Sequence, residues 1–379
     1  MTLSTKITPL SGWNSWNCYG LHVSQELVFR QAQALVEKGL HEFGYQYVII
    51  DDGWQGDRGG PRGALQGNKK FSDLPELVND IHTLGLKVGI YSTPWEKSYG
   101  GFPGSQGHIE EDLHQWEDWG IDFIKYDWEM GGSRYPSQRF IHEVGEALSR
   151  ISRTMVLALA NSAEKSEADF FWRHANMWRT TGDIVDTWES VYGIGVYQTE
   201  WHSFCGPRHW NDADMLVLGH VGWGEKQSFT RLSIEEQKLH AGLWHFLPSP
   251  LLLGCDVSKL DDFTLNLLCN PRLIALHQDH WVRGAELLFR NHRFDVLKRR
   301  LHDGFAFAII NKEPMENHFR FELRDLSDLC PGLEQLGDSL FLVDVWNGEK
   351  LSVSKSAWEF AIPGHGLRLF TMQIPIGRP

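Results

Sequence analysis

The stretch YQYVIIDD, residues 45–52, decides the fold: a mostly apolar run ends in two consecutive aspartates. Runs that are nearly continuous in apolar residues are typical of parallel strands buried on both faces. Further runs of this kind are LKVGIYS (86–92), DFIKYD (122–127), MVLALAN (155–161) and PLLLGCD (250–256). Weaker candidate strands are residues 12–17, 176–181 and 209–216.

Amphipathic segments fill the gaps between these strands. Their apolar residues recur at helical spacing, and several are followed by glycine, as helix ends often are. They cover residues 24–38, 74–84, 110–119, 136–151 and 234–246. Eight strand–helix repeats predict a (β/α)8 TIM barrel over residues 1–281. The alternative is an open doubly wound sheet, but no GxGxxG motif follows the first strand.

The pattern changes from about residue 282. Segments such as GFAFAIINK and SLFLVDVWNGEKLSVS alternate apolar with polar residues and are separated by turn signals. Such alternation is typical of antiparallel strands. We therefore predict a C-terminal β-sandwich domain over residues 282–379, with a packing role.

The bulk composition limits the partners. A net charge of −13 argues against binding to nucleic acid or to an anionic membrane. The 17 tryptophans favour a carbohydrate ligand, because aromatic faces stack on the C–H faces of sugars, although many of them will be core residues. The chain has neither an N-terminal apolar segment of the signal-peptide type nor a long apolar span, so we expect a cytoplasmic protein unless a signal has been removed. Five scattered cysteines contain no CxxC pair, and whether any of them pair stays open.

Polar side chains collect where the predicted strands end, which is where a barrel carries its active site. Like charges are tolerated together mainly at functional sites. Asp127 and Asp183 are a candidate pair of carboxylates for cleaving a glycosidic bond. Structural alternatives remain: Asp183 could cap the next helix, Lys125 could be a plain counter-ion, and Asp214 is expected to order the rim. The residues at these ends are Trp16, Asp51, Asp52, Tyr91, Lys125, Asp127, Asn161, Arg179, Asp183, Asp212, Asp214 and Asp256.

Two other kinds of hydrolase lack their motifs in this sequence. None of the 18 histidines forms HxH or HExxH, so we expect no catalytic metal. A GxSxG nucleophile elbow is also missing.

Six segments in register resemble glycoside hydrolase family 27, the α-galactosidase and α-N-acetylgalactosaminidase family, in its bacterial type. They are GWNSWN (12–17), YVIIDDGW (47–54), GLKVGIYS (85–92), GIDFIKYD (120–127), MWRTTGDI (177–184) and HWNDADMLVLG (209–219). The resemblance implies a barrel with a C-terminal sandwich and a retaining exo-glycosidase that needs no cofactor. It also implies a small carbohydrate, a galactoside, as the partner. Barrels of this kind often associate, which leaves a homo-oligomer open.

The resemblance also implies roles for matching residues. Asp127 would be the nucleophile, held at a low pKa by Lys125, and Asp183 the general acid/base. Hydroxyl contacts fall to Asp51, Asp52 and Lys125, with Arg179 near O2 of the sugar. Trp16 would form the wall by C6, Tyr91 would lie close to the nucleophile, and Asn161 and Asp212 would complete the substrate-binding set.

Departures from the family pattern leave the sugar open. The fifth predicted strand ends in LALANSAEKS (157–166), beside the sugar's 2-position, where Asn161 and Ser162 could admit a 2-acetamido group. HQDH (277–280) also differs from the usual QDP. α-Galactoside is the leading expectation, because both Asp51 and Asp52 are present. The alternatives are α-N-acetylgalactosaminide, β-L-arabinopyranoside or an α-glucoside, and a catalytically silent sugar-binding protein.

Overall fold

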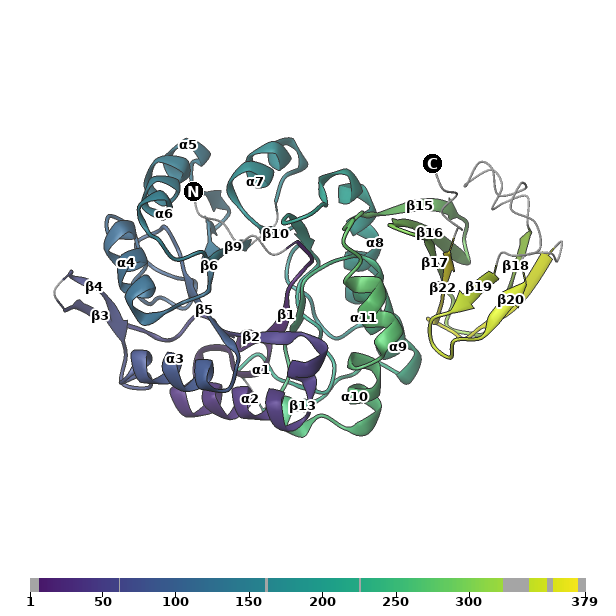
Figure 1. Ribbon diagram of the computed structural model, residues 1–379, viewed down its shortest axis with the longest axis horizontal. Helices are drawn as coiled ribbons and strands as arrows, with labels where there is room; N and C mark the ends of the chain where they lie inside the picture. The colour runs from purple at the N-terminus through teal and green to yellow at the C-terminus, as the bar shows by residue number, and fades with distance from the viewer. Residues whose placement is uncertain are drawn as a thin grey trace.

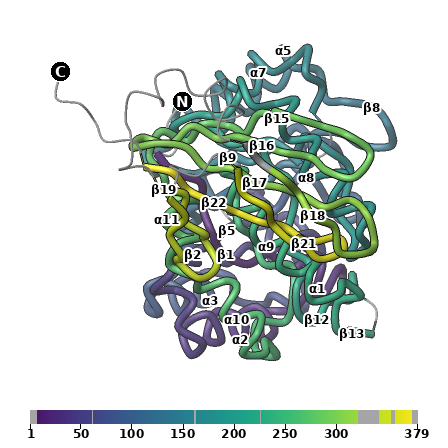
Figure 2. The backbone as a smooth tube through the Cα atoms, turned by 90° about the vertical axis from the view of Figure 1, so that its right-hand side faces the viewer, coloured from purple at the N-terminus to yellow at the C-terminus, as the bar shows by residue number. Residues whose placement is uncertain are grey.

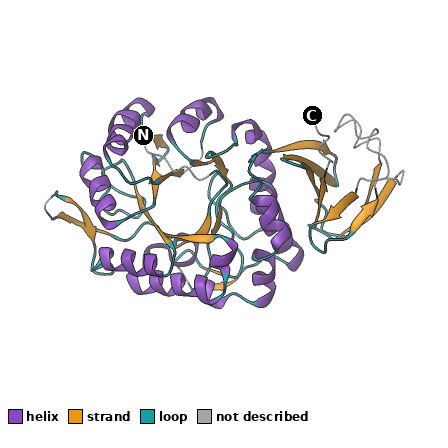
Figure 3. Ribbon diagram, in the orientation of Figure 1, coloured by secondary structure: helices purple, strands orange, loops and turns teal. Residues whose placement is uncertain are grey.

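The computed structural model describes residues 7–60, 62–160, 163–224, 226–322, 341–352 and 357–373 of the 379-residue chain. Helices surround a ring of strands, and a group of further strands lies beside the ring (Figures 1 and 3). Within the described ranges, no helix has the length and apolar character needed to cross a membrane.

Eight parallel strands form the ring. Their neighbours follow the chain order, as expected for a barrel built from successive strand–helix units. The ring closes beyond the last short strand, where Leu216 bridges Leu253 in parallel fashion and its backbone N–H donates to the Leu252 carbonyl at 2.8 Å. The strands are β1 (Ser11–Asn14), β2 (Tyr45–Ile50), β5 (Lys87–Ser92), β6 (Phe123–Asp127), β9 (Val156–Ala160), β10 (Met177–Arg179), β11 (Trp210–Asp212) and β14 (Leu251–Leu253).

Helices cover the outer face of the ring (Figure 3). Side-chain caps define several of their starts: Ser24 and Asp73 each accept a backbone N–H, and Ser233 with Glu236 forms a capping box. The main helices are α2 (Gln25–Glu37), α3 (Leu74–Thr83), α4 (Ile109–Trp119), α5 to α6 (Ser137–Phe140 and Glu146–Arg150, joined by a π-helical turn Ile141–Gly145), α7 (Ala168–His174), α8 (Trp188–Tyr197), α9 (Ile234–Phe246), α10 (Asp262–Leu268) and α11 (Pro271–His277).

The C-terminal strands make two antiparallel sheets. Aromatic contacts join the sheets, with ring centroids 5.1 Å apart for Phe294 and Phe319 and 4.8 Å apart for Phe360 and Phe370. Figure 2 views these strands in front of the barrel. The six-stranded sheet contains β15 (Ala285–Arg290), β16 (Phe294–Leu301), β17 (Gly304–Asn311), β22 (Leu367–Gln373), β19 (Phe341–Asp344) and β20 (Lys350–Ser352), and the two-stranded one contains β18 (Asn317–Glu322) and β21 (Ala357–Ile362).

The barrel and the C-terminal strands share one hydrophobic core. It includes Leu243 of α9, Leu297 of β16 and Leu369 of β22, all of them fully buried. Arg299 crosses this seam, where its Nη1 donates to the carbonyls of Phe246 and Leu276 near the ends of α9 and α11. The two parts are therefore packed as one body rather than tethered.

The predicted barrel with a C-terminal sandwich is confirmed, and the doubly wound alternative is wrong. All eight predicted strands are present, but the weaker ones are shorter than expected: the segment 209–216 gives only β11, since the chain bends away after Asp212 to reach β14. Helices α7, α8, α10 and α11 were not predicted from the sequence.

Gly12 sets how closely β1 approaches β2. A Cβ atom at this position would lie 2.1 Å from the backbone oxygen of Tyr47, closer than any side chain tolerates. The pairing of β1 with β2 also shifts register between Ser11 and Gly12. These two strands carry Asn14 and Asp51 into the mouth of the barrel, so the close approach positions polar groups as well as backbone.

We expect Gly12→Ala to destabilise the protein by about 1–3 kcal/mol or more, because the strands would have to separate. The measurement is the melting temperature. Gly193→Ala is the matched control: it lies in α8, an added Cβ meets nothing within 4 Å, and alanine favours the helix. A melting temperature unchanged in Gly12→Ala would contradict this account of the contact.

Candidate active site

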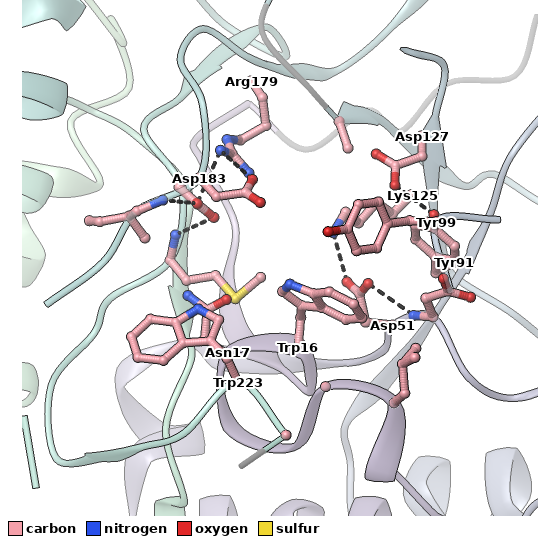
Figure 4. A pocket seen from close by; sticks show the side chains of 18 of the residues that line it. Trp16, Asn17, Asp51, Tyr91, Tyr99, Lys125, Asp127, Arg179, Asp183 and Trp223 are labelled. Carbon is pink, nitrogen blue, oxygen red and sulfur yellow. Dashed lines mark hydrogen bonds and ion pairs between the residues drawn. The ribbon is translucent and has the colours of Figure 1, made fainter. Parts of the chain in front are cut away.

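One pocket opens where the barrel strands end, with a volume of about 590 Å³. In Figure 4, Asp127 and Lys125 lie on one side of it, Arg179 and Asp183 on the other, and Trp16 lies between. The size suits a ligand larger than one sugar ring. The lining residues include Trp16, Asn17, Asp51, Asp52, Tyr91, Tyr99, Lys125, Asp127, Arg179, Asp183, Val185, Asp214, Met215 and Trp223.

Asp51 accepts two hydrogen bonds on one oxygen. Its Oδ2 lies 2.8 Å from Asn14 Nδ2 and 2.8 Å from Lys125 Nζ. Burial alone would lower the pKa of Lys125, but the carboxylates of Asp51 and Asp127 outweigh it and raise that pKa. Lys125 therefore stays charged, and its contact holds the Asp51 side chain at the pocket.

Asp52 ties the loop after β5 to the site. Its Oδ2 accepts the Gly100 backbone N–H at 2.6 Å, and its Oδ1 accepts Gln55 Nε2 at 3.0 Å. Burial raises the pKa of this carboxyl, although these hydrogen bonds oppose the rise. The two adjacent aspartates thus differ in role within the protein: Asp51 meets a lysine, whereas Asp52 anchors a loop.

Asp127 at the end of β6 is held by Tyr91, whose hydroxyl donates to Asp127 Oδ2 at 2.5 Å. Thr93 Oγ1 donates to the Asp127 carbonyl at 2.6 Å, which fixes the backbone as well. The expected low pKa for Asp127 is wrong. Burial raises its pKa to about 6, because desolvation outweighs the opposing effects of Lys125 and the Tyr91 hydrogen bond. Lys125 makes its close contact with Asp51 instead.

The opposite wall is built around Arg179. Its Nη2 lies 3.0 Å from Asp214 Oδ2 and 3.2 Å from Asp183 Oδ1. Burial would lower the pKa of Arg179, but Asp214, Asp212 and Asp183 raise it. The Asp183 side chain is 78% exposed, whereas Asp214 is buried. The Asp183 carboxyl is therefore held by its contact with Arg179 and remains open to an incoming ligand.

The predicted residues do not all reach this pocket. Asp212 lies beneath it, lining a small inner cavity, and burial raises its pKa to about 6. Asp256 is bonded to Gln31 and Ser258, away from the lining. Asn161 and Ser162 lie outside the described residues, so their expected contact with the 2-position stays a prediction. Trp16, Asp51, Asp52, Tyr91, Lys125, Asp127, Arg179 and Asp183 all line the pocket.

Several lining residues were not predicted from the sequence. Asn17 and Met215 each follow a residue it had singled out, so adjacency was an available signal. Tyr99 and Trp223 belong to loops after strand ends and carry no motif. Asp214 was expected to order the rim; it does accept the Ile184 and Met215 backbone N–H groups, and it lines the pocket as well.

Among the residues that the structure describes, one group has the composition of a metal site. The possible ligand atoms of Asp279, His280 and His302 lie within 4.8 Å of one another. None of the three lines the pocket, and His302 Nδ1 already contacts Asp279 Oδ2 at 2.7 Å.

The four described cysteines are free thiols.

The pocket has what a displacement at a sugar carbon requires. One carboxyl is anchored by a tyrosine, a second is exposed on the facing wall, and further carboxylates on the lining can accept sugar hydroxyls. Each side has its own cation, Lys125 on one and Arg179 on the other.

Comparisons with known proteins identify the family. The profile described as alpha galactosidase A, Melibiase_2, matches residues 12–279. The chain is 30% identical to "Alpha-galactosidase A" from Cellvibrio japonicus over 95% of this chain and 90% of that protein. The structure of alpha-galactosidase I from Mortierella vinacea has 29% identity and a TM-score of 0.86, with 98% of both chains covered. A GH27 β-L-arabinopyranosidase from Geobacillus stearothermophilus has 25% identity and a TM-score of 0.83, again with 98% of both chains covered. The predicted resemblance is thereby confirmed, and the chain belongs to the alpha galactosidase A (Melibiase_2) family, glycoside hydrolase family 27.

Proposed function

We propose that the protein is a retaining exo-glycosidase that releases terminal α-linked galactose from small carbohydrates. The observation that carries this proposal is the placement of Asp127 and Asp183 on facing walls of one pocket, with Asp51 beside them (Figure 4). Relatives named α-galactosidase, with 30% identity over almost the whole chain, support the choice of galactose.

The reaction would proceed in two displacements. Asp127 attacks the anomeric carbon while Asp183 gives its proton to the departing oxygen, so the glycosidic bond breaks as a glycosyl–aspartate bond forms. Asp183 then takes a proton from water, whose oxygen displaces Asp127 from the same carbon. Two inversions leave the anomeric configuration unchanged. The exposure of Asp183 fits this exchange with water.

Six further lining residues have roles in this proposal. Asp51 and Lys125 form a fixed acceptor–donor pair for neighbouring hydroxyls of the ring. Asp52 binds a further hydroxyl, Arg179 lies near the 2-position, and Trp16 provides the wall by C6. Tyr91 holds the Asp127 carboxylate in place.

A β-L-arabinopyranosidase activity is the second candidate, because one structural neighbour is an enzyme of that name. Arabinopyranose matches galactose except for C6, so only contacts near Trp16 and Asp52 separate the two sugars. We also infer that residues 282–379 form a packing domain, since their described part shares the barrel's core and contributes no residue to the pocket lining.

Initial rates on matched nitrophenyl glycosides test the sugar. We expect the α-galactoside to be hydrolysed faster than the β-L-arabinopyranoside, the α-N-acetylgalactosaminide and the α-glucoside, because Asp51 and Asp52 are both present. A faster β-L-arabinopyranoside rate would keep the mechanism but overturn the assigned C6 contacts. No hydrolysis of any of the four would contradict the proposed function.

Two substitutions test the roles of the carboxyls. Asp127→Asn should lower kcat by about 10⁴-fold or more on every substrate, because the nucleophile is lost. Asp183→Ala should lower kcat/KM by about 10²–10⁴-fold for sugar leaving groups, which need protonation, and far less for nitrophenyl glycosides. Equal losses of Asp183→Ala on both substrates would count against its acid role. Melting temperatures verify that both variants fold.

The pH dependence of kcat/KM tests the charge on Asp127. Its carboxyl must be ionised to attack, and its pKa is raised to about 6, so kcat/KM should fall as the pH drops through about 6. Tyr91→Phe removes a hydrogen bond that favours the ionised form, so this acidic limb should move to higher pH. Tyr192→Phe, which removes a tyrosine–carboxylate bond to Asp295 outside the pocket lining, is the control and should leave the limb in place. An acidic limb unchanged in Tyr91→Phe would refute the assignment.

A further inference from the structure

The mouth of the pocket has two aromatic side chains on different walls. Tyr99 is 73% exposed and meets Trp16 edge-on, with ring centroids 5.9 Å apart. Trp223 lines the pocket from the loop after β12 (His220–Val221). In the view of Figure 4, the ring of Trp16 lies between those of Trp223 and Tyr99. Neither residue belongs to a motif of the sequence, and their positions in the pocket differ.

Neighbouring residues place each aromatic on one wall of the pocket. Tyr99 precedes Gly100, whose N–H is bound by Asp52, and Asp52 neighbours Asp51 on the side of Lys125 and Asp127. Tyr99 therefore belongs to the wall that carries the nucleophile.

Trp223 belongs to the other wall. Asn17 accepts its backbone N–H at 3.0 Å, and the contacts of Gly254 place Asn17 and Met215 close together. Met215 in turn donates its N–H to Asp214, which also holds the backbone of Ile184, next to Asp183. Figure 4 likewise shows Trp223 and Asp183 in the same half of the pocket.

The backbone at Trp223 is held in a conformation that a bulky residue rarely adopts. Its φ is +46°, in the left-handed region. Both Gly222 and Trp223 donate to the Asn17 carbonyl at 3.0 Å, and a side chain at Gly20 would meet the Trp223 oxygen at 2.9 Å. Such strain persists only where the surroundings fix it, and it is concentrated at ligand sites. The loop thus fixes the main chain that carries this partly exposed indole, which lines the pocket.

We propose that Trp223 is the platform for the sugar ring that leaves, on the far side of the scissile bond. This inference rests on the proposed function. A general acid must lie beside the departing oxygen, so the leaving ring lies on the wall of Asp183, which is the wall of Trp223. An indole face stacks on the C–H face of a pyranose, and its N–H, which has no partner among the described residues, can donate to a hydroxyl. The substrate class is then an oligosaccharide, with a second pyranose attached to the galactose.

The test compares two substrates, α-galactosyl fluoride, which has no leaving ring, and an α-galactosyl disaccharide. Trp223→Ala should lower kcat/KM for the disaccharide by about 3–10-fold, the worth of one aromatic contact, and should change the value for the fluoride by less than about twofold. Trp223→Asn, which tolerates the left-handed backbone, should show the same selectivity. Melting temperatures and inhibition by free galactose should stay near those of the unmodified protein.

Tyr99→Ala is the matched control, since it removes an aromatic from the same mouth on the nucleophile's wall. It should change kcat/KM for both substrates by the same factor. The proposal is overturned if Trp223→Ala and Trp223→Asn affect the two substrates equally, or if Tyr99→Ala alone is selective. Failure of the unmodified protein to hydrolyse the fluoride would instead count against the proposed function.

Discussion

The ion pair between Lys125 and Asp51, 2.8 Å apart in the mouth of the barrel, is the contact on which the site depends. The lining brings together five aspartates and only two side chains that are always cationic, Lys125 and Arg179. Unpaired buried carboxylates would cost several kcal/mol each and would take up protons instead. Each cation therefore acts on more than one acid: Lys125 on Asp51 and Asp127, and Arg179 on Asp214 and Asp183.

Because each cation is shared between two acids, the surroundings of Asp127 and Asp183 differ. Lys125 touches Asp51 rather than Asp127, so burial prevails at Asp127 and raises its pKa to about 6. A carboxylate of higher basicity is a better nucleophile, provided that it is ionised at the working pH. Asp183 is exposed and held by one arginine, which suits a group that has to exchange protons with a leaving oxygen and then with water.

The sequence pattern predicted the features of the site that strands determine, and it did not predict those that loops determine. Apolar runs ending in Asp51, Lys125 and Asp127 fixed both the barrel and one wall, because period-two alternation places residues 125 and 127 on the same face. The sequence alone does not indicate that Lys125 pairs with Asp51, because this contact depends on the positions of β2 and β6 on either side of β5. Asp212 was misplaced as a pocket residue, because β11 is short and the chain turns immediately after it. Tyr99 and Trp223 were missed, since nothing local indicates which aromatic of a long loop turns inward.

Strand ends and loops also contribute differently to the proposed reaction and to the proposed binding of the leaving sugar. Asp51, Lys125 and Asp127 lie at or next to the ends of β2 and β6, so backbone pairing of the barrel fixes their positions, whereas Asp183 lies in the loop after β10. The wall for the leaving sugar comes from a loop whose shape is set by Asn17 and two close glycine contacts. Loops tolerate substitution more readily than barrel strands do. On the proposed assignment, a substitution at position 223 would change the binding of the leaving sugar while Asp127 and Asp183 keep their positions.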